Sequence, residues 1–252
     1  MKTHLHFKSL TSTNTCLKDL AGKYSAKEVQ NFFPPYFVIT ADKQESGRGQ
    51  RGKKWESESG KNLLASFLLY PNIPPNRQFT VCQCISVSVA EFLKETFSIP
   101  NVYIKWSNDI YIGHKKIVGI LIEHSICGEN INYTVAGIGM NINQTIFPSY
   151  LPNATSLYLE TGREYDVVAC MKILIEKIKQ TEKLSTSELK NRYLSFLYKK
   201  DKFSNFIVPK ISDIPISLKI RGVSDSGLLE LLDENEVLHR YAFNEIGYLN
   251  TN

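Results

Sequence analysis

The sequence contains no apolar run long enough to cross a membrane, and its first residues lack the apolar core of a signal peptide. Its five cysteines are odd in number and include no C-x-x-C pair, which argues against a disulfide framework and against a zinc site. The net charge of +5 is mild and no long basic arm is present, so composition gives no argument for nucleic acid. We therefore expect a cytoplasmic protein with reduced thiols and an acidic or phosphorylated small ligand.

Internal repeats and low-complexity segments are also absent, and 252 residues with 42% hydrophobic content can form a sizeable core. Hydrophobic periodicity predicts a larger domain over residues 1–200 and a small all-strand domain over 201–252. In the first, helices are expected after Ser12 and over 77–97, 166–184 and 186–199, with strands near 36–41, 62–70, 102–106, 110–112, 117–123 and 133–139. In the second, strands are expected near 206–208, 216–223, 228–232 and 237–243. This order predicts an antiparallel sheet with helices alongside.

Residues 47–52 have the G-x-G-x-x-G spacing of dinucleotide-binding proteins. That motif requires a strand directly before it and an apolar-periodic helix directly after it. Here the mostly polar residues 42–46 separate it from the preceding strand, and no helical stripe follows Gly52. We therefore exclude NAD and interpret residues 45–55, called the flap below, as a glycine-rich loop that surrounds an anion. A solvated loop without function is the alternative for this motif alone.

Two further polar clusters lie where predicted strands end. The first is KWSND at residues 105–109, and the hairpin that follows it returns Lys116 beside it. The second is GIGMNIN at residues 137–143, where alternating glycines allow a flat group to approach the backbone. Each cluster also has a structural interpretation. Lys105 and Asp109 could form a surface ion pair, Trp106 could belong to the core, and the glycines could mark a bulge.

Taken in order and spacing, these motifs resemble the biotin protein ligase family. The resemblance covers nearly the whole chain and rests on five elements: Ser12-Thr13-Asn14, Gln44 with the flap and Trp55, the KWSND cluster, Lys116 with Gly119, and the GIGMNIN cluster. It implies an α+β fold, in which a mixed or antiparallel sheet is flanked by helices as in class II synthetases. Residues 201–252 resemble the family's small SH3-like β-barrel.

The resemblance implies that biotin's carboxylate attacks the α-phosphate of ATP, and that a lysine of a biotin carboxyl carrier protein then takes the biotinyl group from biotinyl-5'-AMP. Such chemistry needs positioning and electrostatics, and no enzyme nucleophile. The resemblance assigns Lys116, Arg48 and Asp109 to catalysis, with Asp109 orienting or deprotonating the acceptor lysine. The biotin-binding residues it implies are Ser12, Thr13, Asn14, Gln44, Gly47, Arg48, Lys116 and Gly119. The nucleotide-binding residues it implies are Arg51, Trp55, Asn108, Lys116 and Asn141.

ATP and biotin are thus expected as substrates, with Mg2+ accompanying ATP and no metal site made by the protein itself. The expected partner is the biotin carboxyl carrier protein of acetyl-CoA carboxylase or a related carboxylase, and a homodimer is left open. Eleven residues precede Ser12, so we expect the monofunctional form, with no DNA-binding domain. Two departures from the family pattern are Gln50, where another arginine is common, and Ser107, where proline is common.

Two other functions stay open at this point. A lipoate or octanoate ligase or transferase would share the fold, but the G-R-G-x-R-G flap together with the KWSND cluster favours biotin. A non-catalytic biotin or nucleotide sensor would be expected to have lost a charged site residue, whereas Arg48, Asp109 and Lys116 are all present.

Overall fold

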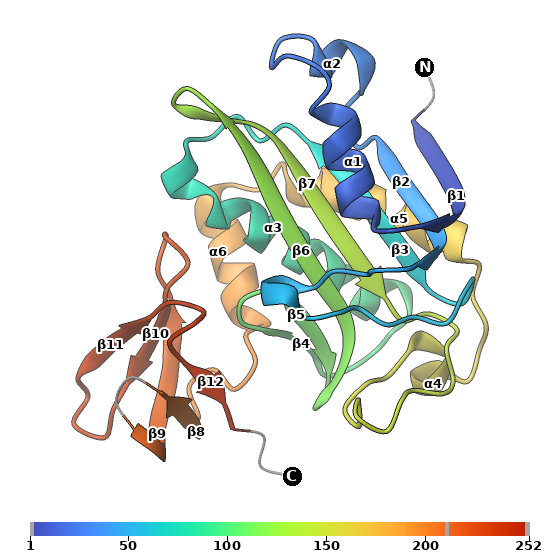
Figure 1. Ribbon diagram of the computed structural model, residues 1–252. Coiled ribbons are helices and arrows are strands. Elements are labelled where there is room, and N and C mark those ends of the chain that lie inside the picture. Colours follow the sequence, from blue (N-terminus) through green and yellow to red (C-terminus); the bar gives the residue numbers. More distant parts are fainter. Residues whose placement is uncertain (1–2, 210–211, 250–252) are drawn as a thin grey trace.

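The computed structural model describes residues 3–209 and 212–249. These residues form two β-sheets with helices packed against the larger one (Figure 1). The larger sheet has the strand order β1 (His4–Leu10), β2 (Val38–Gln44), β3 (Leu63–Leu69), β7 (Asn130–Met140), β6 (Lys115–Cys127), β5 (Asp109–Ile112) and β4 (Val102–Lys105). Strands β1 and β2 run parallel, and the other neighbouring pairs run antiparallel. The sheet is therefore mixed.

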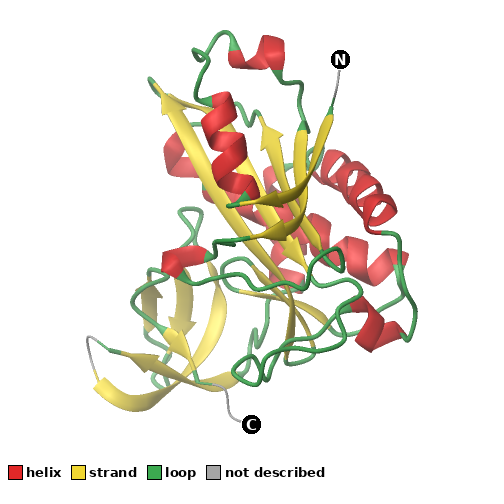
Figure 2. Cartoon of the chain, turned by 45° about the vertical axis from the view of Figure 1, so that its right-hand side comes forward, coloured by secondary structure: helices red, strands yellow, loops and turns green. Residues whose placement is uncertain are grey.

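Helices cover both faces of this sheet, as Figure 2 shows. Strand β3 explains why, because its alternating side chains reach two separate apolar clusters: Leu68 packs with Leu17 of α1, and Phe67 packs into the cluster that contains α3 and α5. A strand buried on both faces has an almost continuous apolar sequence. The helices are α1 (Thr13–Ala21), α2 (Val29–Phe32), α3 (Phe79–Glu91), α4 (Leu157–Thr161), α5 (Val167–Thr181) and α6 (Thr186–Ser195).

The smaller sheet is antiparallel and lies beside α6 and the β4 edge of the larger one (Figure 1). Its order is β11 (Leu238–Tyr241), β10 (Leu229–Leu232), β9 (Ser212–Val223), β8 (Phe203–Val208) and β12 (Gly247–Tyr248). Strand β12 was not predicted. It has two residues and carries no alternating pattern of its own, so only its pairing with β8 identifies it.

The two sheets share one apolar core. The segment that connects them pairs with both, since Leu197 forms a bridge with Ile104 of β4 and Lys200 forms one with Ile220 of β9. Buried residues such as Phe206 and Ile220 belong to the same cluster as Ile104. A domain boundary at residue 200 therefore stays a prediction, and the C-terminal module is packed firmly against the rest of the chain.

Most predicted elements are present, with differences at their ends. The helix expected over 77–97 consists of a 3-10 turn at Pro75–Arg77, helix α3, and a π-helical turn at Phe92–Thr96. The hairpin of β6 and β7 extends well past the predicted strands, through His124 and Cys127. Its outer end carries polar residues on both faces because it projects beyond the helices, so alternation could not reveal it.

Candidate active site

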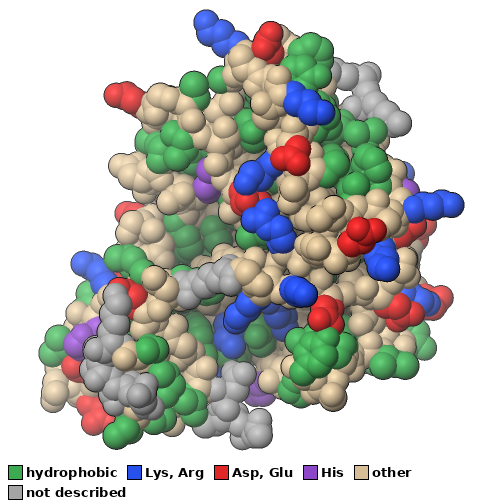
Figure 3. Space-filling model, in the orientation of Figure 1, with side chains coloured by type: hydrophobic (Ala, Val, Ile, Leu, Met, Phe, Trp, Pro, Cys, Tyr) green, Lys and Arg blue, Asp and Glu red, His purple; other side chains and the backbone are tan. Residues whose placement is uncertain are grey.

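A cavity of about 620 Å³ opens on the face of the larger sheet that carries α1. Its walls come from the start of α1, the flap, the ends of β5, β6 and β7, the loop over residues 147–154, and residues 243–248 of the C-terminal module. Figure 3 shows Lys and Arg side chains gathered in and around the hollow between the main body and that module. A larger hollow of about 940 Å³, lined by residues such as Pro100, Glu160 and Arg163, contains none of the predicted site residues.

Most of the predicted site residues line the 620 Å³ cavity, although they are far apart in the sequence. They are Ser12, Thr13, Asn14, Gln44, Arg48, Trp55, Asn108, Asp109, Lys116, Gly119 and Asn141. Gly47 does not line it. A Cβ on Gly47 would lie 2.4 Å from the carbonyl oxygen of Trp55, so this glycine permits the flap to fold on itself. The side chain of Arg51 lies outside the part that the structure describes.

The flap contains no α-helix, which agrees with the exclusion of an NAD-binding turn. Only a 3-10 turn, Gln50–Gly52, follows Gly49. The flap folds back as a narrow hairpin, in which the backbone N–H of Trp55 donates to the carbonyl of Gly47 at 2.9 Å. At its far end Glu56 accepts a hydrogen bond from the hydroxyl of Tyr150, across the mouth of the cavity. That contact was not predicted from the sequence.

The first turn of α1 forms a buried polar network at one end of the cavity. The hydroxyl of Ser12 caps the helix, accepting from the N–H of Thr15 at 3.5 Å. The amide oxygen of Gln44 accepts from the backbone N–H of Thr13 at 2.8 Å and from its hydroxyl at 3.1 Å. On β3, the hydroxyl of Ser66 lies 2.8 Å from the hydroxyl of Thr13, which fixes the orientation of these groups.

Asn14 connects this network to the sheet. Its side-chain oxygen accepts from Ser66 at 2.5 Å, and its side-chain nitrogen donates to Glu123 at 3.0 Å. It sits against Gly137, where a Cβ would come within 2.1 Å of the Asn14 oxygen. Gly137 is therefore needed for close packing of α1 on β7. Asn14, predicted to bind biotin, serves as a support for the site.

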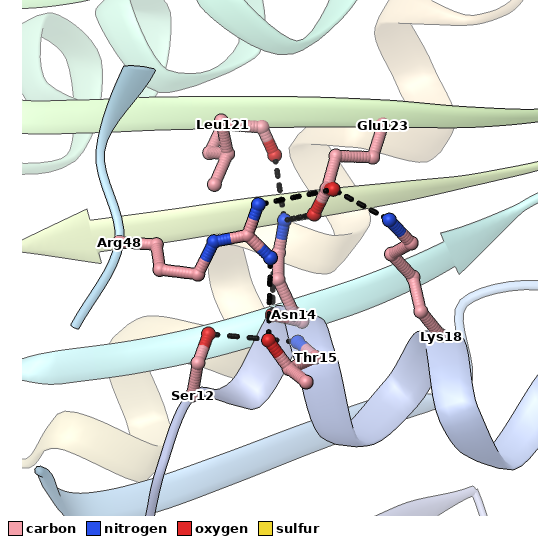
Figure 4. Close-up of polar contacts among 8 residues, drawn as sticks. Ser12, Asn14, Thr15, Lys18, Arg48, Leu121 and Glu123 are labelled. Atoms are coloured by element: carbon pink, nitrogen blue, oxygen red, sulfur yellow. Dashed lines mark hydrogen bonds and ion pairs between the residues drawn. The ribbon is translucent and has the colours of Figure 1, made fainter. Parts of the chain in front are cut away.

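Arg48 extends from the flap toward the sheet and rests on Glu123 of β6 (Figure 4). Its guanidinium lies 3.5 Å from the Glu123 carboxylate and 3.3 Å from the hydroxyl of Thr15. The same carboxylate accepts from Lys18 of α1 at 2.7 Å. Burial opposes ionisation of Glu123, but its bonds with Lys18 and Asn14 and the two nearby cations prevail and lower its pKa. Glu123 and Lys18 are site residues that the sequence did not reveal.

Lys116 and Asp109 form an ion pair inside the cavity, with 2.7 Å between the Lys116 Nζ and the Asp109 Oδ1. About a third of each side chain stays exposed, 33% and 35%. The β5–β6 ladder brings them together because it shifts register between Ile110 and Tyr111, a bulge that re-aims the side chains beside it. The alternative of an ion pair between Asp109 and Lys105 is wrong, since Lys116 takes the carboxylate.

Trp55 fills the floor of the cavity. Gly119 of β6 and Gly139 of β7 face each other across the ladder, and the indole lies on this bare backbone. A Cβ on Gly139 would come within 2.5 Å of the ring, and one on Gly119 within 2.8 Å. The buried indole Nε1 has no hydrogen-bond partner among the described residues. The sequence predicted a flat group on the alternating glycines Gly137 and Gly139. At Gly139 that group is the protein's own tryptophan, whereas Gly137 lies against Asn14.

The two predicted nucleotide-binding asparagines differ in how many of their side-chain amide groups are hydrogen-bonded. Asn108 donates to the carbonyl of Ile120 and accepts from Ser107 at 2.8 Å, so it braces the hairpin from within. Asn141 donates to the carbonyl of Thr155 at 2.9 Å, but its buried side-chain oxygen has no donor within the described chain. An unpaired buried acceptor beside a cavity is suited to a ligand that donates a hydrogen bond.

Within residues 3–209 and 212–249, no group of three or more His, Cys, Asp or Glu side chains is arranged to hold a metal ion. His4 and His6 both contact the hydroxyl of Thr40, at 2.7 and 3.0 Å. Across the same residues, no helix has the length and apolar character that membrane crossing requires.

Comparison with known proteins agrees with this arrangement. Residues 6–141, more than half of the chain, match the biotin/lipoate A/B protein ligase family. The bifunctional ligase/repressor BirA of Bacillus subtilis is 34% identical over 160 residues, which cover 62% of this chain and 46% of that protein. BirA of Escherichia coli is 28% identical over 239 residues, covering 94% and 71%. The solved biotin protein ligase of Aquifex aeolicus, in complex with biotin and ATP, aligns over 100% of both chains with 27% identity and a TM-score of 0.76.

The chain spans about half the length of the Bacillus relatives that it matches. Its likeness to the Aquifex structure extends over both sheets, which confirms the predicted α+β fold with a small C-terminal β module. The matched segment includes α1, the flap, the Lys116–Asp109 pair and the two facing glycines. The chain therefore belongs to the biotin/lipoate A/B protein ligase family.

Proposed function

We propose that this chain is an ATP-dependent biotin protein ligase that carries out two steps in one cavity. In the first step a carboxylate oxygen of biotin attacks the α-phosphorus of ATP, and the bond to the bridging oxygen breaks as pyrophosphate leaves. In the second step a lysine amine of a biotin carboxyl carrier protein attacks the carbonyl carbon of biotinyl-5'-AMP. AMP then leaves and the amine loses a proton.

One observation carries this proposal: Lys116, Arg48 and the Gly119–Gly139 surface share a single cavity. The first step brings two anions, a carboxylate and a phosphate, within bonding distance. Cations at that point reduce the repulsion and stabilise the charge that grows on the α-phosphate. We assign this task to Lys116 as a compact charge and to Arg48 as a planar donor fork.

Arg48 must leave Glu123 to take this role, and the energies permit it. The contact is long, 3.5 Å, and 48% of the Arg48 side chain is exposed. Solvent screening limits such a pair to under about 1 kcal/mol. A charge-assisted hydrogen bond to a shielded ligand contributes roughly 1.5–3 kcal/mol. Ligand binding therefore outweighs the resting contact, while Lys18 continues to neutralise Glu123 at 2.7 Å.

We assign biotin to the Gly119 side of the floor and the nucleotide to the Asn141 side. Ser12, Thr13 and Gln44 supply polar groups for the ureido ring, supported from behind by Asn14 and Ser66. The unpaired oxygen of Asn141 suits an exocyclic amine such as that of adenine. Trp55 has to move off the glycines when the ligand arrives. An unpaired buried N–H costs about 1–3 kcal/mol, which favours this release.

Asp109 serves the second step in this account. Once Lys116 engages the adenylate, the carboxylate is released from its partner and can orient the incoming lysine amine or accept its proton. We assign Mg2+ to the phosphates of ATP, because Asp109 and Glu56 are the only carboxylates among the described residues that line the cavity, and the ion would take its other ligands from phosphate oxygens and water. Neither role involves an additional protein metal site.

The main rival is a lipoate or octanoate ligase or transferase, because the matched family covers lipoate as well as biotin ligases. The Aquifex relative that aligns over the whole chain was solved with biotin, which favours biotin for this chain as well. A sensor without activity is disfavoured because Arg48, Asp109 and Lys116 are retained and line the same cavity.

Transfer to a carrier tests the proposal. The purified chain is incubated with biotin, MgATP and an isolated biotin carboxyl carrier domain, and the carrier is then analysed by mass spectrometry. We expect one biotinyl group on one lysine, formed only when ATP is present. A carrier domain with that lysine changed to arginine is the control. Transfer of lipoate in preference to biotin would assign the chain to the other branch of the family.

A further inference from the structure

Lys105 is a partly buried cation on the wall of the cavity, and no function assigned so far uses it. Its ammonium lies 4.9 Å from the ring centre of Tyr111 and 5.0 Å from that of Tyr248, and 3.4 Å from the Tyr111 hydroxyl. Tyr248 belongs to the C-terminal module, so Lys105 lies between the two sheets. Lys105 forms no ion pair with another residue that the structure describes. Two rings hold the charge in position without neutralising it.

The cavity around Lys105 has more positive than negative charge. Lys53, Lys105 and Lys116 all line it, and Asp109 is already paired with Lys116 at 2.7 Å. Burial lowers the pKa of Lys105, Asp109 opposes that effect, and the nearby lysines add to it. A cation kept here without its own carboxylate favours a mobile anion as its partner.

The strand pairing orders these groups along a line. Gly139 faces Gly119, Gly119 faces Asp109, and Asp109 faces Lys105, so one row crosses β7, β6, β5 and β4. Paired residues on adjacent strands carry side chains on the same face of a sheet, about 5 Å apart. The row therefore begins at the bare glycines, passes the Lys116–Asp109 pair, and ends roughly 15 Å away at Lys105.

The reacting groups of an adenylation, namely the acyl group, the α-phosphate and the leaving pyrophosphate, can be placed along this row in the same order. In the proposed function the acyl group lies over Gly119 and the α-phosphate lies at Lys116. In phosphoryl-type displacements the attacking and leaving oxygens are roughly in line with the phosphorus. The leaving diphosphate is then directed along the row, away from the glycines and toward β4, where Lys105 is the cation it meets.

We propose that Lys105, held between Tyr111 and Tyr248, binds the β- and γ-phosphates of ATP and stabilises the departing pyrophosphate. This inference rests on the proposed function and adds to it a role for the C-terminal module, which supplies Tyr248. The competing explanation is that Lys105 only fastens that module to the catalytic sheet. In that case its loss would affect both half-reactions and the stability of the fold alike.

The test separates the two half-reactions. Lys105→Gln and Lys105→Arg are compared with the wild type in biotin-dependent pyrophosphate exchange and in transfer from biotinyl-5'-AMP supplied ready-made, which carries no pyrophosphate. The control is Lys199→Gln, which removes the charge of a nearby lysine that does not line the cavity.

We expect Lys105→Gln to raise the KM for ATP on the order of tenfold or more, as loss of a charge-assisted contact implies. Transfer from the adenylate should stay within about twofold of wild type, since only pyrophosphate contacts are lost. Lys105→Arg should retain most of the ATP affinity.

Binding measured by calorimetry in the absence of biotin tests the phosphate subsite independently of biotin activation. Binding of MgATP and of AMP to the wild type and to Lys105→Gln is measured without biotin. Weaker binding of MgATP with unchanged binding of AMP supports the subsite, even if the wild type gives no biotin-dependent exchange and the proposed function fails. Equal affinities of both proteins for MgATP, or equal losses for MgATP and AMP, would overturn it.

Discussion

The indole of Trp55 lies directly on the backbone of Gly139, so close that a Cβ at this position would come within 2.5 Å of the ring. The flap thus covers the same bare patch of sheet that a flat ligand would need. Only glycine at both members of the Gly119–Gly139 pair permits this contact. The floor of the resting cavity is covered by a side chain that must be displaced, and several consequences can be measured.

Gly139→Ala should remove Trp55 from the sheet, because the new methyl group occupies the position of the ring. Trp106→Phe as a common background leaves Trp55 as the only tryptophan, since the chain has two. In the ligand-free protein we expect red-shifted emission and greater quenching by acrylamide than in the background alone. Gly222→Ala is the control, because its Cβ would meet only atoms at 3.7 Å. Unchanged emission in Gly139→Ala would mean that Trp55 does not rest on the glycines in solution.

Lys116→Ala should leave the fold intact and lower the rate of adenylation by on the order of a hundredfold, the usual cost of one lost transition-state contact. Asp109 is then unpaired, but its partial exposure lets water solvate it. Lys115→Ala is a matched control, because this neighbouring lysine is exposed and does not line the active-site cavity. Comparable exchange rates in Lys116→Ala and Lys115→Ala would remove Lys116 from the chemistry.

Glu123→Gln should strengthen binding of the adenylate, because the resting partner of Arg48 loses its charge. The gain should be at most about fivefold, in keeping with an exposed ion pair of under ~1 kcal/mol. Equilibrium binding of a non-hydrolysable biotinyl-AMP analogue measures it, with Glu129→Gln on the exposed β6–β7 hairpin as control. Markedly weaker binding would instead mean that Glu123 holds Arg48 in its working position.

His124 should make the protein less stable in mild acid. It is half-buried on β6, 2.8 Å from the hydroxyl of Thr134, and burial lowers its pKa from 6.5. Below pH 6.5 the unfolded chain therefore binds a proton that the folded chain resists, so unfolding free energy falls until the pH passes the folded-state pKa. His124→Asn should reduce the drop in Tm between pH 7.5 and pH 5.5. The same drop in both proteins would contradict this.

Local sequence was enough to predict part of this site. The cap at Ser12, the apolar strand β3 and the hairpin between KWSND and Lys116 depend on neighbours in the chain, so spacing and periodicity reveal them. The alternating glycines also predicted a place where a flat group meets bare backbone, and the structure has Trp55 there at Gly139. The exclusion of NAD depended on the absence of a helix directly after the flap, and in the structure only a 3-10 turn follows Gly49.

Other contacts depend on register and long-range packing, which the sequence does not display. Arg48 and Glu123 are 75 residues apart in the sequence. They meet only because β6 brings Glu123 beside α1. Lys105 meets Tyr248 because a two-residue strand in the C-terminal module pairs with β8. Trp55 was expected among the nucleotide-binding residues, and its place on the floor follows from the alignment of two glycines across a ladder.

Exchange of labelled pyrophosphate into ATP tests the central claim most directly, because it reports adenylate formation without a carrier protein. The purified chain is supplied with MgATP and with biotin, lipoate or octanoate in parallel. We predict rapid exchange that depends on biotin, and exchange with the other two acids no faster than without any acid. Exchange driven by lipoate or octanoate, or no exchange with biotin in a folded preparation, would contradict the account.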